Sequence, residues 1–351
     1  MPCGVDFPRS LASGILKFFS AHPPEVLARV NIVVNTKRMR LRLLEEFVSL
    51  GSILIPNVHV VSDLSELIGT FKDPNPKSHL QYRFELMGLV QKLIEQQPDL
   101  ASKSALYDLT DNLAKLIDEL QGENVTPSII KKLNVEDQSG HWQRILHFVD
   151  IVTTYLEKRN LEPDSEGFQR NQVRALLKGW EEFPPENYIF IAGSTGSRGT
   201  TLELIKGIYG LNKGVVVLPG FDFHMPETVL GSISDPLIGE DHPQYRFVKM
   251  LKGLNVKYKD VGIWPTGSPP SIPRNKLISL ALRPAPFTDS WMSEGPKLEC
   301  LDRACEGLSL FEAENQREEA LAIAMVLRKA ADQNKRAALV TPDRRLARQV
   351  T

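Results

Sequence analysis

Three glycines and an acidic residue in the middle of the chain have the spacing of a dinucleotide site. Gly193, Gly196 and Gly199 lie in the segment AGSTGSRGT, between a buried-strand pattern and a helical pattern. Such a turn presents backbone N–H groups at a helix N-terminus, where a pyrophosphate can bind. Asp222 follows the next strand pattern, where an acid that binds a ribose hydroxyl would lie. The pattern raises the hypothesis of a nucleotide-dependent oxidoreductase.

A tyrosine and a lysine four positions apart could complete that chemistry. Tyr245 and Lys249 form a YxxxK pair of the kind that short-chain dehydrogenases use. However, the chain between Gly199 and Tyr245 is too short for the several βα units that separate these features in such enzymes. We therefore favour a glycine-rich strand-to-helix turn without a cofactor. An NAD(P)-dependent oxidoreductase that uses the GxxGxxG turn and YxxxK remains the alternative.

Hydroxyl and cationic side chains follow three of the strand patterns, where a helix N-terminus and positive charge could meet a phosphate backbone. The candidate DNA-binding residues are Thr36, Lys37, Arg38, Arg40, Ser197, Arg198, Thr341, Arg344 and Arg345. Two alternatives are open. The cations of the first cluster could be the solvated face of an amphipathic helix, and the residues of the AGSTGSR turn could cap their own helix. The four tryptophans are candidate platforms for base stacking, although core positions would also explain them.

The sequence contains no Ser-His-Asp, HExxH or CxxC constellation, so we predict no catalytic residue and no metal site. Cys300 and Cys305 supply two ligands at most, in a spacing without a strong metal precedent. Three cysteines cannot build a disulfide framework, which favours the cytoplasm. We also predict no membrane partner, because no apolar run is long enough to span a bilayer.

Composition limits how the chain could bind nucleic acid. It has 351 residues, 42 of them basic and 43 acidic, with a net charge of −1. Any contact with DNA must therefore come from a local basic stripe, because the chain has no globally positive field. The length predicts two or three units with their own cores. The chain ends after a strand, a turn and a very short helical pattern, so we expect a fragment of a longer polypeptide.

The elements that must position these residues alternate between strand and helix. Such βαβ units predict an α/β fold with a parallel sheet. We predict the first part of an α/β domain over 1–80, a helical insertion over 81–183, the rest of that domain with a Pro-rich crossing segment over 184–294, and the start of a second α/β domain over 295–351. The predicted strands are 30–34, 53–55, 58–61, 188–192, 214–218, 308–311 and 337–340. The predicted helices are 11–19, 37–50, 80–97, 104–121, 140–160, 168–183, 200–209 and 316–331.

Several stretches resemble superfamily 1 DNA helicases, and more closely the N-terminal part of the AddB subunits of alphaproteobacterial AddAB helicase–nucleases. RVNIVVNTKRMRLRLLEEF is similar to the early strand and helix of the family, where helicases carry motif Ia. NYIFIAGSTGSRGTTLELIKGIYGLNKGVVVLPGFD is similar to the family's AGSTGS and VVLPG segment, and HPQY follows it. FEAENQREEALAIAMVLRKAADQNKRAALVTPDRRLARQV is similar to the entry into the second motor-like domain. The resemblance implies a RecA-like domain of the superfamily 1 helicase type with a helical insertion.

Both halves of a motor's phosphate site have lost their characteristic residues. Where a P-loop would lie, the chain reads PCGVDFPRSLASG, and bulky Phe7 and Pro8 follow Gly4 instead of the glycine, lysine and hydroxyl residue that cradle phosphates. The segment YIFIAGSTGS ends in Gly193 and Ser194 where a helicase has an Asp-Glu pair. The degenerate nucleotide-site positions are Gly4, Arg9, Ser10, Gly193 and Ser194.

The resemblance implies a non-catalytic, helicase-like part of a double-strand-break repair subunit. It would bind or guide single-stranded DNA or a duplex end and dock an AddA-like helicase–nuclease subunit as a heterodimer. That partner would use ATP and Mg²⁺, whereas this chain would need no cofactor. Full-length members of the family add a C-terminal exonuclease. A module that only binds another protein is a further alternative.

Overall fold

The computed structural model describes the chain except residues 53, 65–66, 68–77, 97, 99–101 and 123–164. The chain divides into two compact units, Met1–Glu299 and Cys300–Thr351. The first unit contains a parallel sheet with helices on both faces, and the second consists of helices and irregular segments in the described residues. The expectation of an α/β protein with a parallel sheet is therefore confirmed.

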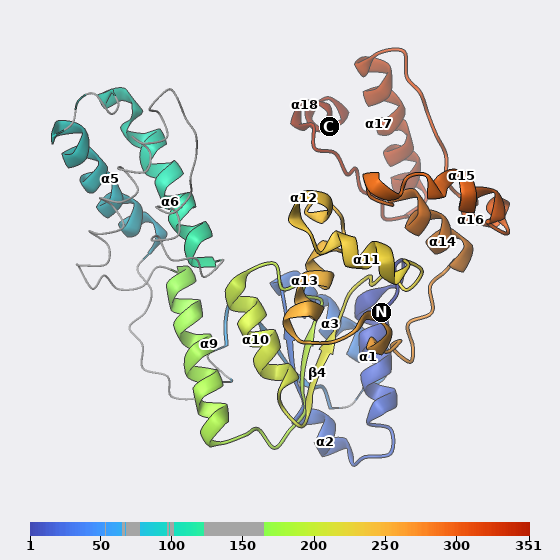
Figure 1. Ribbon diagram of the computed structural model, residues 1–351, viewed down its shortest axis with the longest axis horizontal. Coiled ribbons are helices and arrows are strands. Elements are labelled where there is room, and N and C mark those ends of the chain that lie inside the picture. The colour runs from blue at the N-terminus through green and yellow to red at the C-terminus, as the bar shows by residue number, and fades with distance from the viewer. Residues whose placement is uncertain (53, 65–66, 68–77, 97, 99–101, 123–164) are drawn as a thin grey trace. The chain divides into compact units, whose positions relative to one another are not determined.

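Four short strands make up the sheet of the first unit, whose strand β4 is labelled in Figure 1. They are β1 (Asn31–Val34), β2 (Asn57–Val60), β3 (Ile189–Ala192) and β4 (Gly214–Val217). Their order is β2-β1-β3-β4, and every neighbouring pair is parallel. The strand patterns at 30–34, 58–61, 188–192 and 214–218 thus predicted all four strands to within a residue or two at each end. Their β-branched and aromatic residues favour an extended backbone that is buried on both faces.

Alternate residues of the central strands point into two separate cores, as the period of two in a strand requires. Ile32, Val34 and Phe190 join residues of α1 (Phe7–Phe18) and α3 (Lys37–Ser49) in one core. Val33 and Ile191 join residues of α9 (Ser165–Glu182), α10 (Gly199–Tyr209) and α13 (Tyr245–Gly253) in the other. The helices that connect β1 to β2 and β3 to β4 therefore lie on opposite faces of the sheet, so the fold is doubly wound.

The described part of the predicted helical insertion contains a pair of helices with its own core. These are α5 (His79–Gln96) and α6 (Leu106–Gly122), preceded by the 3-10 turn η1 (Lys103–Ala105). The predicted helix over 140–160 lies outside the described residues. Helix α9, which the sequence places in the insertion, contributes Val173 and Leu176 to a core of the sheet.

The rest of the first unit is helical after β4. Its elements are α11 (Glu227–Ile233), α12 (Pro236–Gly239), α13, η2 (Tyr258–Asp260), α14 (Ile272–Ala281), η3 (Ala285–Phe287), α15 (Ser290–Glu294) and η4 (Gly295–Lys297); the short α2 (Pro24–Ala28) precedes β1. The Pro-rich stretch 265–296 was expected to be a segment that crosses between domains. This stretch contains helices; α14 forms there because Ser271 caps it and a proline occupies its first turn.

The second unit corrects two strand predictions. It contains α16 (Leu301–Cys305), α17 (Gln316–Asp332) and α18 (Arg344–Val350), and the helix predicted over 316–331 is confirmed. The segments 308–311 and 337–340 are not strands in this fully described unit. They do not pair with each other, and a strand without a partner leaves its backbone groups unpaired. Leu310 and Val340 are consequently 87% and 93% exposed.

The segment before β2 differs from its prediction. The predicted strand at 53–55 is wrong in its described part, because Leu54 and Ile55 lie in an irregular loop; residue 53 lies outside the described residues. Every helix in the described part of the chain is too short or too polar to cross a membrane.

Candidate functional site

The most suggestive part of the sheet is the carboxyl end of its two central strands. Val34 at the end of β1 is in register with Ala192 at the end of β3. The chain leaves these two strands toward opposite faces and opposite edges of the sheet, which makes this point the topological switch of the fold. Open α/β sheets bind their ligands in the crevice at such a point. The turns after the two strands are therefore the first candidate site.

An aromatic ring lies against the β3 side of this crevice. Gly193 follows β3 with a φ of +80°, and a Cβ atom added there would lie 3.2 Å from Cε1 of Phe7. Phe7 is the first residue of α1, so the start of α1 and the end of β3 are in contact. The same carbon position would lie 3.9 Å from Oδ1 of Asn35, which follows β1. Phe7 thus occupies space where the backbone of a nucleotide loop would have to approach a phosphate.

The N-terminal residues have the strand–turn–helix order of a P-loop but not its chemistry. The Met1 amine donates to the Leu218 carbonyl at 2.8 Å, and Pro2 forms a parallel bridge with Phe221. Gly4 then turns with a φ of +78°, and α1 begins at Phe7. The Asp6 carboxylate caps α1 by accepting from the Arg9 N–H at 3.4 Å. A carboxylate therefore stands at the helix end that would receive phosphate.

The remaining degenerate positions have structural partners. The Ser10 carbonyl accepts from the Trp264 indole at 2.9 Å and from the Thr266 hydroxyl at 2.7 Å. The Ser194 hydroxyl accepts from the N–H of Gly196 at 3.2 Å. No group of histidine, cysteine or acidic side chains suited to holding a metal ion exists among the described residues. Ser10 and Ser194 therefore have structural roles. Trp264, which donates to Ser10, packs against the core that contains residues of α1 and α3.

The turn after β1 presents exposed positive charge. The Thr36 hydroxyl caps α3 by accepting from the Met39 N–H at 3.1 Å. Lys37, Arg38 and Arg40 are exposed, and none of them makes an ion pair within the described part of the chain. Arg42 differs, because it pairs with Glu46, which is buried. Three cations thus remain available at the N-terminal end of α3.

The turn after β3 does not use its hydroxyls to cap the following helix. Arg198 is the N-cap residue of α10 and makes no side-chain cap hydrogen bond. The expectation that the AGSTGSR residues cap their own helix is therefore wrong. Ser197 and Arg198 are exposed, and the nearby Thr200 hydroxyl is buried without a hydrogen-bond partner in the described structure. The partial positive charge of this helix end is left to an outside acceptor.

The third predicted cluster lies in the second unit and has a different character. Asp343 caps α18 by accepting from the Arg345 N–H at 2.7 Å, and its own N–H donates to the Thr341 hydroxyl at 3.0 Å. Arg344 and Arg345 are exposed. Since an acid occupies the helix end, this turn offers an anion less than the turns after β1 and β3 do.

The residues of the oxidoreductase alternative do not converge on a cofactor site. Tyr245 is 5% exposed and packs in an apolar cluster with Val229 and Ile233, whereas Lys249 is exposed. One carboxylate oxygen of Asp222 accepts from the N–H of His224 at 2.8 Å and so closes its own turn. The structure thus gives Tyr245 a role in the core.

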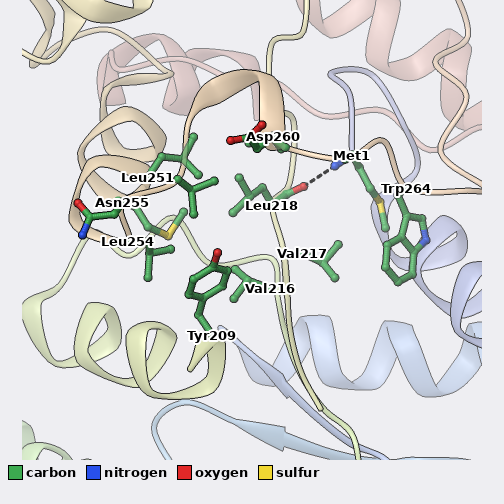
Figure 2. A pocket seen from close by; sticks show the side chains of 14 residues that line it. Met1, Tyr209, Val216, Val217, Leu218, Leu251, Leu254, Asn255, Asp260 and Trp264 are labelled. Carbon is green, nitrogen blue, oxygen red and sulfur yellow. Dashed lines mark hydrogen bonds between the residues drawn. The ribbon is translucent and has the colours of Figure 1, made fainter. Parts of the chain in front are cut away.

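One pocket lies along the outer edge of β4 (Figure 2). It has a volume of about 290 Å³ and is lined mainly by apolar side chains, among them Val216, Leu251 and Trp264. The Met1 amine reaches Leu218 at its border. Burial lowers the pKa of this amine from 8.0 to about 6. With few polar groups converging, this pocket does not point to chemistry.

The second pocket lies beyond the carboxyl ends of the strands and is lined by a larger number of polar residues. It contains His242, whose Nδ1 accepts from the Gln244 N–H at 3.1 Å while Nε2 lies 2.9 Å from the Leu282 carbonyl. Because the Gln244 N–H donates to Nδ1, this nitrogen carries no proton, and the proton of the neutral ring lies on Nε2. Burial lowers the pKa of His242, against smaller raising effects of the Leu282 carbonyl and Asp222. The ring is therefore neutral at pH 7.

The chain is thus an α/β protein whose first unit is built on a four-stranded, doubly wound parallel sheet. Searches against protein-family models and curated protein sequences give no match to it. The functional assignment accordingly depends on the geometry described above and on the resemblance in sequence.

Proposed function

We propose that this chain is a non-catalytic, RecA-like part of a DNA double-strand-break repair subunit of the AddB type. In this proposal it binds or guides single-stranded DNA in the cytoplasm and docks an active AddA-like helicase–nuclease. The observation that carries the proposal is the pairing of two features at the switch point. Phe7 fills the crevice against Gly193, while Lys37 and Arg38 stand exposed and unpaired, within the described residues, at the end of the neighbouring strand.

The physical basis for DNA binding is electrostatic. A strand of DNA carries a regular row of phosphates, and Lys or Arg side chains that neutralise them release condensed counterions. The turns after β1 and β3 lie side by side at the carboxyl ends of the strands, because these two strands are parallel neighbours in register. Lys37 and Arg38, together with the N-terminus of α10, form one positive margin there. Such a positive margin can bind the phosphate backbone of DNA, but it does not distinguish one base sequence from another.

The same geometry argues against ATP hydrolysis by this chain. A P-loop holds phosphates with backbone N–H groups and a lysine, and a helicase activates water with acids at the end of a neighbouring strand. Here Asp6 caps the helix, and Gly193 follows the strand. ATP and Mg²⁺ would be used by the partner subunit, and one working motor is enough to move DNA.

The test is single-strand binding as a function of salt. Titration of the full chain with a labelled oligothymidylate should give a binding constant whose logarithm falls linearly with the logarithm of salt concentration. Each phosphate contact contributes about 0.7 to that slope for a single strand. The double variant Lys37→Ala/Arg38→Ala should therefore lower the slope by about 1.4 and the affinity about 25-fold at roughly 0.1 M salt.

A variant with the same change of charge elsewhere serves as the control. Lys257→Ala/Lys259→Ala removes two exposed lysines that lie around η2, away from both turns. It should leave the slope within about 0.3 of the unmodified protein. Equal losses in the two double variants would mean that only net charge matters, and the assignment of the turn after β1 would then be wrong.

A further inference from the structure

The pocket beyond the carboxyl ends of the strands has walls suited to a mostly apolar ligand. Its volume is about 500 Å³, within the range of small-molecule sites. Phe223, Pro243 and Leu282 contribute apolar wall. Thr195 also lines it, two residues before the exposed Ser197 of the turn after β3. The pocket therefore begins where the proposed phosphate margin ends.

One of its buried hydroxyls has no partner. Ser279 of α14 is 3% exposed, and its Oγ makes no hydrogen bond in the described structure. Leaving a buried polar group unsatisfied destabilises a protein, so such groups are rare without a reason. Because Ser279 lines the pocket, a ligand there becomes a partner for its hydroxyl once the side chain rotates toward the pocket.

The pocket also contains side-chain oxygens that can accept hydrogen bonds from a ligand. One oxygen of the buried Asp222 carboxylate accepts from the His224 N–H, and no described residue donates to the other oxygen. The side-chain nitrogen of Asn275 donates to the Cys3 carbonyl at 2.9 Å. The side-chain oxygen of Asn275 is therefore left to accept from a ligand. Arg274 brings positive charge to the same pocket. A ligand must therefore bring hydrogen-bond donors to Asp222.

We propose that this pocket binds a guanine base. Guanine is flat, and its pairing edge presents two adjacent N–H donors that match a carboxylate, whereas each of the other DNA bases presents a single donor group on that edge. Charged acceptors strengthen such bonds, and apolar walls suit the faces of the ring. The base could belong to a single strand held at the turn after β3 or to a free nucleoside. The first source rests on the proposed function, and the second does not.

The experiment compares four deoxynucleosides by calorimetry with the full chain, and then oligothymidylates with and without one guanine. Deoxyguanosine should bind at least tenfold more tightly than deoxyadenosine, deoxycytidine or thymidine. Asp222→Asn should remove that preference, because an amide keeps the cap on His224 but replaces the second oxygen by a donor. Ser279→Ala should weaken deoxyguanosine binding without loss of stability, so it tests the pocket even if the first variant misfolds.

The matched control is Asp235→Asn. Asp235 also accepts from a backbone N–H two residues later, at 3.0 Å, but it is exposed and does not line the pocket. Equal binding of all four nucleosides, no binding of any nucleoside or guanine-containing strand, or equal effects of the two Asn variants would overturn the proposal. Deoxyguanosine binding without any strand binding would keep the pocket and refute the DNA function. Strand binding without a preference for guanine would keep the DNA function and refute the guanine pocket.

Discussion

The contact between Phe7 and Gly193 makes a quantitative prediction about stability. Gly193→Ala places a side chain on a residue with a φ of +80° and brings its Cβ to 3.2 Å from the Phe7 ring. The left-handed backbone alone costs about 1–2 kcal/mol for alanine, and the stiffer unfolded chain returns about 0.4–1 kcal/mol. Close packing against a ring edge adds about 1 kcal/mol, the lower end for an overpacked site. We expect a total loss of about 2 kcal/mol.

Gly51 provides a matched comparison for the backbone term. It has a φ of +78°, and a Cβ added there meets nothing within 4 Å. Gly51→Ala should therefore cost about 1 kcal/mol less than Gly193→Ala. Urea denaturation followed by tryptophan fluorescence measures the difference, because all four tryptophans belong to the first unit.

A double variant isolates the contact itself. In a Phe7→Leu background the ring edge is gone, so Gly193→Ala should then cost no more than Gly51→Ala. The interaction energy of the cycle should be about 1 kcal/mol. An interaction energy of zero would show that Phe7 does not fill the crevice, and the structural reason for denying this chain a nucleotide site would be lost.

The remaining predictions concern pH, a helix cap and cofactors. Because the pKa of folded His242 lies below its usual value of about 6.5, the unfolded chain binds the proton more tightly. The free energy of unfolding should therefore fall as pH is lowered through 6.5, and urea denaturation at pH 7.5 and 5.5 should show a smaller fall in His242→Gln. Thr36→Ala should cost about 1 kcal/mol by removing the cap of α3, measured in the same way; no loss would mean that the cap contributes nothing. Calorimetric titration with ATP–Mg²⁺ and with NAD(P)H should give no heat of binding, and micromolar binding of NAD(P)H would restore the oxidoreductase alternative.

The sheet could be predicted from sequence because its strands are buried on both faces. Runs such as YIFIA and GVVV are apolar and β-branched throughout, and the intervening helices fix the strands as parallel. The segments 308–311 and 337–340 have the same local pattern but find no partner strand in their unit. Strand formation depends on a neighbour, which a local pattern does not reveal.

The candidate site was predictable only where it depends on local order. Strand-to-helix turns can be located in the sequence, so Lys37 and Arg38 were found together with their exposure. The pocket proposed to bind guanine was not predicted, because Asp222 and Ser279 are far apart in the chain. The signal for α14 was present in Ser271 followed by proline, but the density of prolines around it favoured a linker. Tertiary packing alone brings this helix to the end of β4.

The central claim is that the chain holds a DNA strand without using a nucleotide. Its most direct test is the equilibrium titration of a labelled oligothymidylate with the full chain, in the presence and absence of ATP–Mg²⁺. The account predicts salt-dependent binding whose affinity is the same in both conditions. Binding that appears, disappears or shifts several-fold when ATP–Mg²⁺ is added would contradict it, because the crevice beside Phe7 would then be a working nucleotide site.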